Sequence, residues 1–371
     1  MADAPAVLIA AMSGRALAEA ANRSGYAALV ADCFGDLDTV AAARAHIQLT
    51  PKPGGIDGDE LIAALETLAA GQQPAGAVYG TGLEDRPALI ERIARRWNLL
   101  GNPADVVSAL KDPVRFAALC LACAIPHPEI ALEPPADAAG WLKKRRGGSG
   151  GVHVRSAADP GGSAAVYFQR RVEGDPVSAL FLAAGKRATI LGLSRQWPQP
   201  APDQPFRYGG AARPAAISVD HAAAIADAVR RLAASADLVG LNSADFLVGA
   251  NDFWLLEVNP RPGATLDIFE PHGTSLFALH LAACRGDLAV AEPELSDAAA
   301  SATVYAHRDI PTMPALAWPA WAADRQSPGS RVSAGQPLCT VRAVAASADE
   351  ARALALGRQA TILATIDAEL P

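Results

Sequence analysis

The sequence FWLLEVNPRP at residues 253–262 decides the predicted fold and site. Its first residues are almost entirely apolar, as in a buried strand, and polar side chains then occupy every second position. Because side chains alternate between the two faces of an extended strand, we expect Glu257, Asn259 and Arg261 on one face. The opposite face would take the intervening apolar residues, Leu256 and Val258.

A second strand is predicted at residues 243–248, and residues 249–252 have the composition of a turn. If this hairpin is centred on Asn251, Asp245 lies opposite Glu257, and side chains opposite each other are about 5 Å apart at Cβ. Two carboxylates and an amide in that space require a counter-charge, which a divalent cation with oxygen ligands supplies. The alternative is a surface hairpin whose acids never meet, and the rigid Pro-bracketed arginine that follows disfavours it.

The composition indicates a globular protein of two or three domains, with 371 residues, 51% of them hydrophobic and 19% charged. A formal net charge of −7 makes an extended nucleic-acid surface an unlikely feature. The cysteines are odd in number and scattered, so we expect no disulfide framework and a reducing compartment. No stretch of 18 apolar residues and no secretory leader is found, which predicts a cytoplasmic protein without membrane contact.

The first part of the chain has the pattern of a doubly wound α/β layer. Residues 6–11 form a short apolar run, residues 16–24 a helix pattern and residues 26–32 a second apolar run. The glycine pattern G-x-G-x-x-G is absent, so a dinucleotide-binding interpretation is rejected. The polar residues Ser13, Arg15 and Asp36 follow the predicted strands and are either turn residues, which we favour, or contacts to a substrate.

A basic, glycine-dense segment at residues 141–154 is predicted to be a hairpin with a flexible tip. Four consecutive basic residues precede its glycines, and glycine lets backbone N–H groups approach an anion closely. It is not a Walker A loop, because Gly-Lys-Ser/Thr is absent and no helix pattern follows. A Gly-Ser linker is the alternative, although linkers seldom carry four basic residues between two strands.

These features, in this order, resemble the ATP-grasp superfamily of ligases, whose metal-binding strand commonly ends in Glu-x-Asn-Pro-Arg. The resemblance covers about residues 1–300 and is strongest over 103–262. It implies an α/β fold with three parts: a pre-ATP-grasp domain at 1–102, a two-lobed ATP-grasp domain at 103–300 with its lid at about 128–165, and a small β-rich extension at 301–371.

The resemblance also implies roles for individual residues. Lys111 precedes a helix that stops at an Ile-Pro-x-Pro-like turn and matches the lysine that contacts phosphates; a solvent-facing lysine is the alternative. Lys144 matches the lid lysine better than Lys143, with the register left open by one residue. The implied metal ligands are Asp245, Glu257 and Asn259, and the implied catalytic residues are Arg261 and Lys144. The implied nucleotide contacts further include Gly148, Ser149, Gly150, Gly151, Gln169, Arg171, Val172 and Asp175. Pro176 or Val177 falls where many members carry the acidic residue that holds the ribose, so that contact stays open.

The implied activity is that of a carboxylate–amine ligase using ATP with Mg²⁺ or Mn²⁺ on small-molecule substrates, and dimers are common for this fold. The Ser13-Gly14-Arg15 opening and the Pro-Gly tail are similar to ATP-grasp proteins of methanopterin and methanofuran-type one-carbon cofactor biosynthesis. Some of these join glutamate to tyrosine or tyramine. The alternatives are a biotin-carboxylase-like enzyme that activates bicarbonate and a catalytically silent nucleotide-binding protein.

Overall fold

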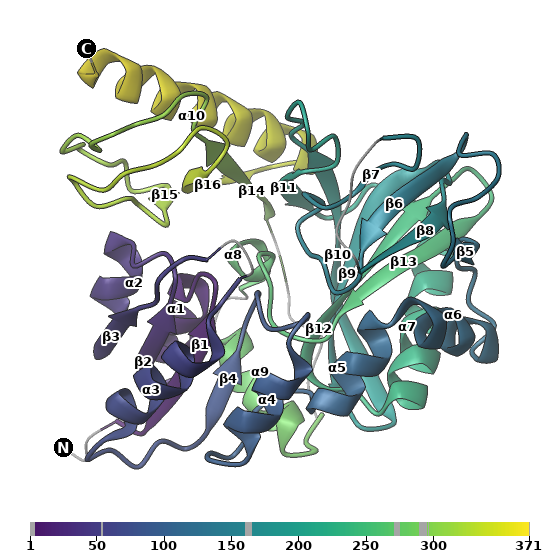
Figure 1. Ribbon diagram of the computed structural model, residues 1–371, viewed down its shortest axis with the longest axis horizontal. Helices are drawn as coiled ribbons and strands as arrows, with labels where there is room; N and C mark the ends of the chain where they lie inside the picture. Colours follow the sequence, from purple (N-terminus) through teal and green to yellow (C-terminus); the bar gives the residue numbers. More distant parts are fainter. Residues whose placement is uncertain are drawn as a thin grey trace.

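The computed structural model describes residues 4–52, 55–159, 165–270, 275–288, 295 and 297–370. Figure 1 shows the N-terminal sheet on the left, the lid strands on the right, the central sheet extending from β13 on the right to β15 at the upper left, and helix α10 along the top. No helix within these ranges is long and apolar enough to cross a membrane.

The N-terminal sheet is parallel and has the strand order β3-β2-β1-β4. Its first two strands are buried along their whole length, which confirms the predicted strand–helix–strand pattern. The strands are β1 (Ala6–Ala11), β2 (Ala27–Asp32), β3 (Ala45–Gln48) and β4 (Ala77–Tyr79). The helices around them are α1 (Arg15–Arg23), α2 (Leu37–Ala42), α3 (Gly58–Ala69) and α4 (Pro87–Ala94).

The central sheet has eight strands in the order β13-β12-β9-β10-β11-β14-β16-β15. Helix α7 packs on one face, and α8 and α9 lie with α1 on the other. Its strands are β9 (Asp175–Ala184), β10 (Arg187–Pro198), β11 (Tyr208–Arg213), β12 (Val239–Val248), β13 (Phe253–Asn259), β14 (Ala298–Tyr305), β15 (Ala322–Ala323) and β16 (Pro337–Ala345). Its helices are α5 (Ala104–Lys111), α6 (Pro113–Ala122), α7 (Val219–Ala236), α8 (Leu266–Phe269), α9 (Leu276–Cys284) and α10 (Ala348–Glu369).

Two features of the central sheet differ from the sequence-based expectation. The boundary expected between residues 300 and 301 falls inside β14, because this strand pairs with β11 and continues the same sheet. Residues 198–214 are rich in Pro and Gly, a composition typical of a loop, yet β11 lies there. Its glycines, which suggested a loop, allow close packing: a Cβ at Gly210 would lie 2.3 Å from the Trp197 ring.

The lid is a separate four-stranded sheet in the order β5-β8-β6-β7. The predicted basic hairpin is present, since β6 (Trp141–Arg145) pairs antiparallel with β7 (Arg155–Ser156). Strand β8 (Val166–Arg170) pairs with both β6 and the short β5 (Ile130–Ala131), so the sheet extends past the expected lid end at residue 165.

The hairpin of β12 and β13 places Asp245 opposite Glu257, as predicted. The pairing shifts by one residue between Asp245 and Phe246, so that Leu256 is left without an opposite residue as a β-bulge. The bulge changes which side chains face the core. Leu255 and Val258 both belong to the buried core that also contains the apolar face of α7, whereas Leu256, expected there, is half-buried.

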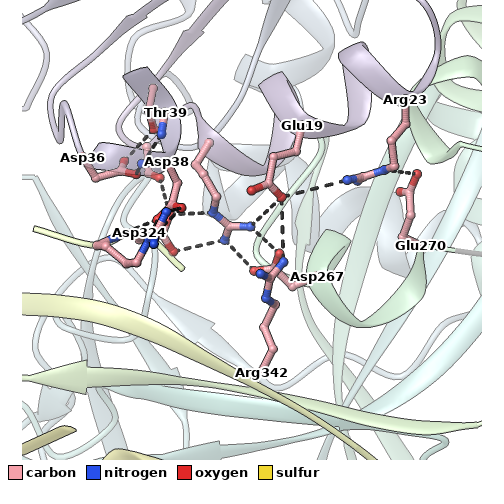
Figure 2. Close-up of polar contacts among 12 residues, drawn as sticks. Glu19, Arg23, Asp36, Asp38, Thr39, Asp267, Glu270, Asp324 and Arg342 are labelled. Atoms are coloured by element: carbon pink, nitrogen blue, oxygen red, sulfur yellow. Dashed lines mark hydrogen bonds and ion pairs between the residues drawn. The ribbon is translucent and has the colours of Figure 1, made fainter. Parts of the chain in front are cut away.

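Buried ion pairs of Arg15 join three parts of the chain. The guanidinium donates from Nη1 and Nη2 to Asp267 of α8 at 2.5 and 2.6 Å, and from Nε and Nη2 to Asp324, just after β15, at 2.9 and 3.0 Å. Figure 2 shows Asp267 and Asp324 together with Glu19, whose carboxylate lies 3.4 Å from Nη1. Arg15 is 3% exposed, and although burial opposes its charge, the Asp267 and Asp324 carboxylates outweigh burial and hold its pKa well above the usual range.

Arg15→Ala is expected to lower the free energy of unfolding by about 3–5 kcal/mol, because Asp267 and Asp324 would be left buried without a counter-charge. The matched control is Arg23→Ala on the same helix, which removes a half-exposed pair with Glu270 and should cost less than about 1 kcal/mol. Urea denaturation measures both values, and equal losses would contradict the structural role of Arg15.

His280 of α9 is buried and joins two segments through both ring nitrogens. Its Nδ1 accepts from the Leu241 amide at 2.9 Å, and its Nε2 donates to the Leu100 carbonyl at 3.0 Å. This pattern requires a neutral ring. Burial lowers the pKa of His280 from 6.5 to about 4.

The unfolded chain therefore binds one more proton at this position between pH 4 and 6.5, and stability falls as the pH decreases through that range. From pH 7 to pH 5 we expect a loss of about 2 kcal/mol from this group. His280→Gln should remove that part of the pH dependence, whereas His221→Ala, on the exposed start of α7, should leave it unchanged. Denaturation curves at both pH values test this, and an unchanged pH dependence in His280→Gln would contradict it.

Candidate active site

The carboxylates of Asp245 and Glu257 form the centre of the candidate site. Asp245 accepts from the Asn259 amide at 3.0 Å and from the Gln196 amide at 3.2 Å. Burial and the neighbouring Glu257 raise the pKa of Asp245 to about 6. The two acids therefore lie close enough to repel each other, and positive charge nearby would stabilise their ionised forms.

Lys111 supplies part of that charge. It is the last residue of α5, and the Asp112 carboxylate directly after it caps α6 by accepting from the amides of Val114 and Arg115. The Lys111 ammonium donates to Asn259 Oδ1 at 3.1 Å and lies 3.7 Å from Glu257 Oε2. Although burial opposes ionisation of Glu257, Lys111 and further positive charges outweigh it and lower the pKa of this carboxyl.

The lid contributes Lys144 to the same site. Its ammonium donates to Gln169 Oε1 at 3.1 Å, and its charge is among those that lower the pKa of Glu257. Lys143 points to the other side of β6, where it donates to the Asp159 carbonyl at 2.6 Å. The geometry therefore favours Lys144 over Lys143 as the residue directed toward the acids.

The glycine loop after β6 packs closely against the body of the protein. The Gly150 carbonyl accepts from the Tyr208 amide at 2.9 Å, and a Cβ at Gly151 would lie 1.9 Å from the Phe206 carbonyl oxygen. Gly151 also has a φ of +72°, which side chains other than glycine rarely adopt. Gly148 is buried and Ser149 half-buried.

The expected nucleotide strand is β8 with the residues that follow it. Gln169 is 2% exposed, and its Nε2 has no hydrogen-bond partner among the described atoms. The Arg171 amide donates to the Gly140 carbonyl at 2.8 Å, and the Val172 side chain is half-buried. Asp175 is exposed and pairs with Arg195 at 2.7 Å. It lies at the start of β9, three residues before Ser178, the residue opposite Asp245.

Arg261 is held by the N-terminal domain. Its Nε and Nη2 each lie 2.6 Å from Glu84 Oε1, and Nη2 lies 3.5 Å from Asn259 Oδ1. The preceding Pro260 carbonyl accepts from the Tyr79 hydroxyl at 3.2 Å and from the Asn102 amide at 3.0 Å. These contacts fix where the chain leaves β13.

Sequence reasoning did not identify Glu84, Gln196 or His153 of the lid as site residues. Glu84 could have been found, since it follows β4 and loops at the carboxyl ends of parallel strands often carry functional groups. Gln196 and His153 carry no such signal. Ser13 and Arg15, considered as substrate contacts, are hydrogen-bonded to Asp324 instead, and Asp36 caps α2.

The donor set fits a hard divalent cation. Asp245, Glu257 and Asn259 present carboxylate and amide oxygens, the ligands that Mg²⁺ prefers. Elsewhere in the described ranges, as here, no group of three or more His, Cys, Asp and Glu side chains is placed to bind a metal. A cation at the hairpin would therefore complete its coordination with oxygens from outside the protein, such as those of a phosphate or water.

Comparisons with known proteins agree with this geometry. Residues 118–265 match the ATP-grasp domain model. None of the curated proteins matches the chain in sequence. Among solved structures, one similar to this chain is the biotin carboxylase domain of Hydrogenobacter thermophilus 2-oxoglutarate carboxylase, in complex with MgADP, ADP and bicarbonate. It is 13% identical, with a TM-score of 0.72 over 92% of this chain and 86% of that chain. The N5-carboxyaminoimidazole synthetase of Staphylococcus aureus, complexed with ADP, is 14% identical, with a TM-score of 0.70 over 96% and 97%.

The chain therefore has the ATP-grasp fold, as the sequence resemblance implied. A Campylobacter jejuni biotin carboxylase is similar to the same extent, with 14% identity and a TM-score of 0.70 over 94% of this chain and 89% of that chain. At these identities the likeness establishes the fold, and the chemistry has to be argued from the residues of the site.

Proposed function

We propose that this protein is an ATP-dependent carboxylate–amine ligase. One observation carries the proposal: Lys111 of α5 and Lys144 of the lid converge on Asp245, Glu257 and Asn259 of one hairpin. Two lysines above a pair of acids suit a phosphate chain bound through a divalent cation, because the acids hold the metal and the lysines contact the phosphates.

In the proposed reaction, an oxygen of the substrate carboxylate attacks the γ-phosphorus of ATP, and ADP leaves. The resulting acyl phosphate is attacked at its carbonyl carbon by an amine, which loses a proton as the amide forms and phosphate departs. A magnesium or manganese ion bound by Asp245, Glu257 and Asn259 would neutralise charge on the phosphates. Protein catalysis of this kind is positioning and charge stabilisation, and it uses no protein nucleophile.

Each type of contact that the resemblance implies has a candidate residue in this chain. Lys111 and Lys144 would bind phosphate oxygens, and the loop of Gly148, Ser149, Gly150 and Gly151 would cover them with backbone N–H groups. The unpartnered Gln169 amide and the backbone through Arg171 and Val172 would face the base. Arg261 would stabilise the acyl phosphate, with Glu84 fixing the orientation of its guanidinium. Asp175 lies next to Pro176 and Val177, which match the ribose-binding position, and is a candidate nucleotide contact.

For the substrates, we propose an amino-acid carboxylate and an aromatic amine, with glutamate and tyrosine or tyramine as the first pair to test. The sequence similarity to one-carbon cofactor enzymes supports this pair. Bicarbonate is a second candidate for the carboxylate, because two of the similar structures are biotin carboxylases and one of them contains bicarbonate.

The experiment is to measure ADP release from MgATP across a panel of carboxylates and amines. Stimulation that requires one carboxylate together with one amine supports the ligase. Stimulation by bicarbonate without an amine would instead support the carboxylase alternative. Nucleotide binding with no stimulation by any pair would favour a silent binder, and no nucleotide binding would end the proposal.

Glu257→Ala is expected to lower turnover at least about 100-fold while the protein stays folded, because a metal ligand is lost. Asp252→Ala is the matched control, since it removes an exposed carboxylate from the turn of the same hairpin and should leave turnover unchanged. Circular dichroism and the melting temperature confirm folding. Full activity of Glu257→Ala would refute the assignment of the metal site.

Lys144→Met and Lys143→Met form a second matched pair, because the two lysines are neighbours on β6 and are 7% and 9% exposed. Lys144→Met is expected to weaken MgATP binding at least about tenfold through loss of a charge-assisted phosphate contact. Lys143→Met should change it less than about threefold. Titration calorimetry measures both constants, and the opposite order would assign the role to Lys143.

A further inference from the structure

His153 lies at the end of the glycine loop, two residues before β7. Its ring packs against Gly148, where a Cβ would lie 2.4 Å from two ring carbons. Only glycine at position 148 leaves room for this arrangement, so the loop is shaped around the histidine. His153 therefore occupies space in the lid that a side chain at position 148 would fill.

The Nδ1 atom of His153 is buried and has no hydrogen-bond partner in the described part of the chain. Buried polar atoms of proteins are nearly always paired, so an unpaired one indicates a partner that binds later. The Nε2 amide nitrogen of Gln169, at the base of the lid sheet, is unpaired in the same way. The Nε atoms of Arg145 and Arg146 are also unpaired among the described residues, so the lid presents four unsatisfied nitrogen atoms to a ligand with several acceptor oxygens or ring nitrogens.

The charges around His153 are those of the candidate site. Glu257 on the hairpin favours the protonated ring, whereas Lys144, Arg145 and Lys111 disfavour it. Burial is the largest effect, and together these lower the pKa of His153 to about 4. The ring is therefore neutral near pH 7 and carries one N–H group, which can donate to an anion without adding a charge that the lysines would repel.

We propose that His153 is a phosphate-binding residue of the lid, whose Nδ1–H donates a hydrogen bond to an oxygen of the γ-phosphate of ATP. This inference rests on the proposed function and adds a residue to it. The γ-phosphate is favoured over the β-phosphate because the His153 ring lies within electrostatic reach of Glu257, which would hold the metal at the reacting end of the nucleotide. A role as the base that deprotonates the amine is disfavoured, because a weakly basic ring accepts protons poorly at neutral pH.

The test compares MgATP and MgADP binding by titration calorimetry in the full-length protein. His153→Ala is expected to weaken MgATP binding about tenfold, the loss of one hydrogen bond to a charged group, and MgADP binding less than about twofold. His153→Asn places an amide nitrogen near the position of Nδ1 and should restore most of the MgATP affinity. His153→Gln, whose amide lies nearer the position of Nε2, should restore less.

His307→Ala, which removes an exposed histidine near the C-terminal helix, serves as the control and should change neither constant. Equal weakening of MgATP and MgADP in His153→Ala, or no weakening of either, would overturn the inference while nucleotide binding by the unmodified protein upholds the ATP site. A Gln variant that binds MgATP better than the Asn variant would refute Nδ1 as the donor. Absence of nucleotide binding in the unmodified protein would refute the proposed function itself.

Discussion

The interaction on which the arrangement of domains depends is the buried pairing of Arg15 with Asp267 and Asp324. The Arg15 guanidinium donates hydrogen bonds to two carboxylates, and both of these belong to segments more than 250 positions away in the sequence. Because a buried charge without a partner is costly, each of these segments is held in place by the other two. These ion pairs thereby fix three parts of the chain relative to one another: the N-terminal sheet, the short helix α8 and the region after β15.

The site itself depends on a different constraint, the one-residue bulge at Leu256. A regular hairpin with the observed turn would pair Asp245 with Leu256 and not with Glu257. The extra residue restores the facing pair of acids and turns Leu255 and Val258 together into the core. The bulge thus lets β13 place its acid opposite Asp245 and also bury both Leu255 and Val258. A strictly alternating strand with this sequence could not do both.

Much of this could be predicted from the sequence, where the signal is local. The strands of the hairpin, its facing acids, the basic lid hairpin and the parallel N-terminal layer all follow from periodicity and turn chemistry. The prediction that Asp245 faces Glu257 was right although its reasoning assumed a symmetric turn; the bulge compensated for the shifted centre. Non-local contacts could not be predicted. Three contacts depend on how distant segments pack: the Glu84–Arg261 pair, the hydrogen bond from Gln196 to Asp245 and the buried ion pairs of Arg15. Strand β11 was missed for another reason, because its glycines suggest a loop but serve close packing.

The exit of the chain from β13 has a consequence for motion. The carbonyl of Pro260 is bound by Tyr79 of the N-terminal sheet and by Asn102, which is fully buried and also contacts the Val239 carbonyl and amide at the start of β12. A hinge between the N-terminal layer and the central sheet would break these hydrogen bonds and the Glu84 pair together. The glycine loop of the lid, by comparison, is joined to the body by a backbone hydrogen bond from the Tyr208 amide to the Gly150 carbonyl. The N-terminal layer and the central sheet are therefore fixed relative to each other by several buried polar contacts that would have to break at once.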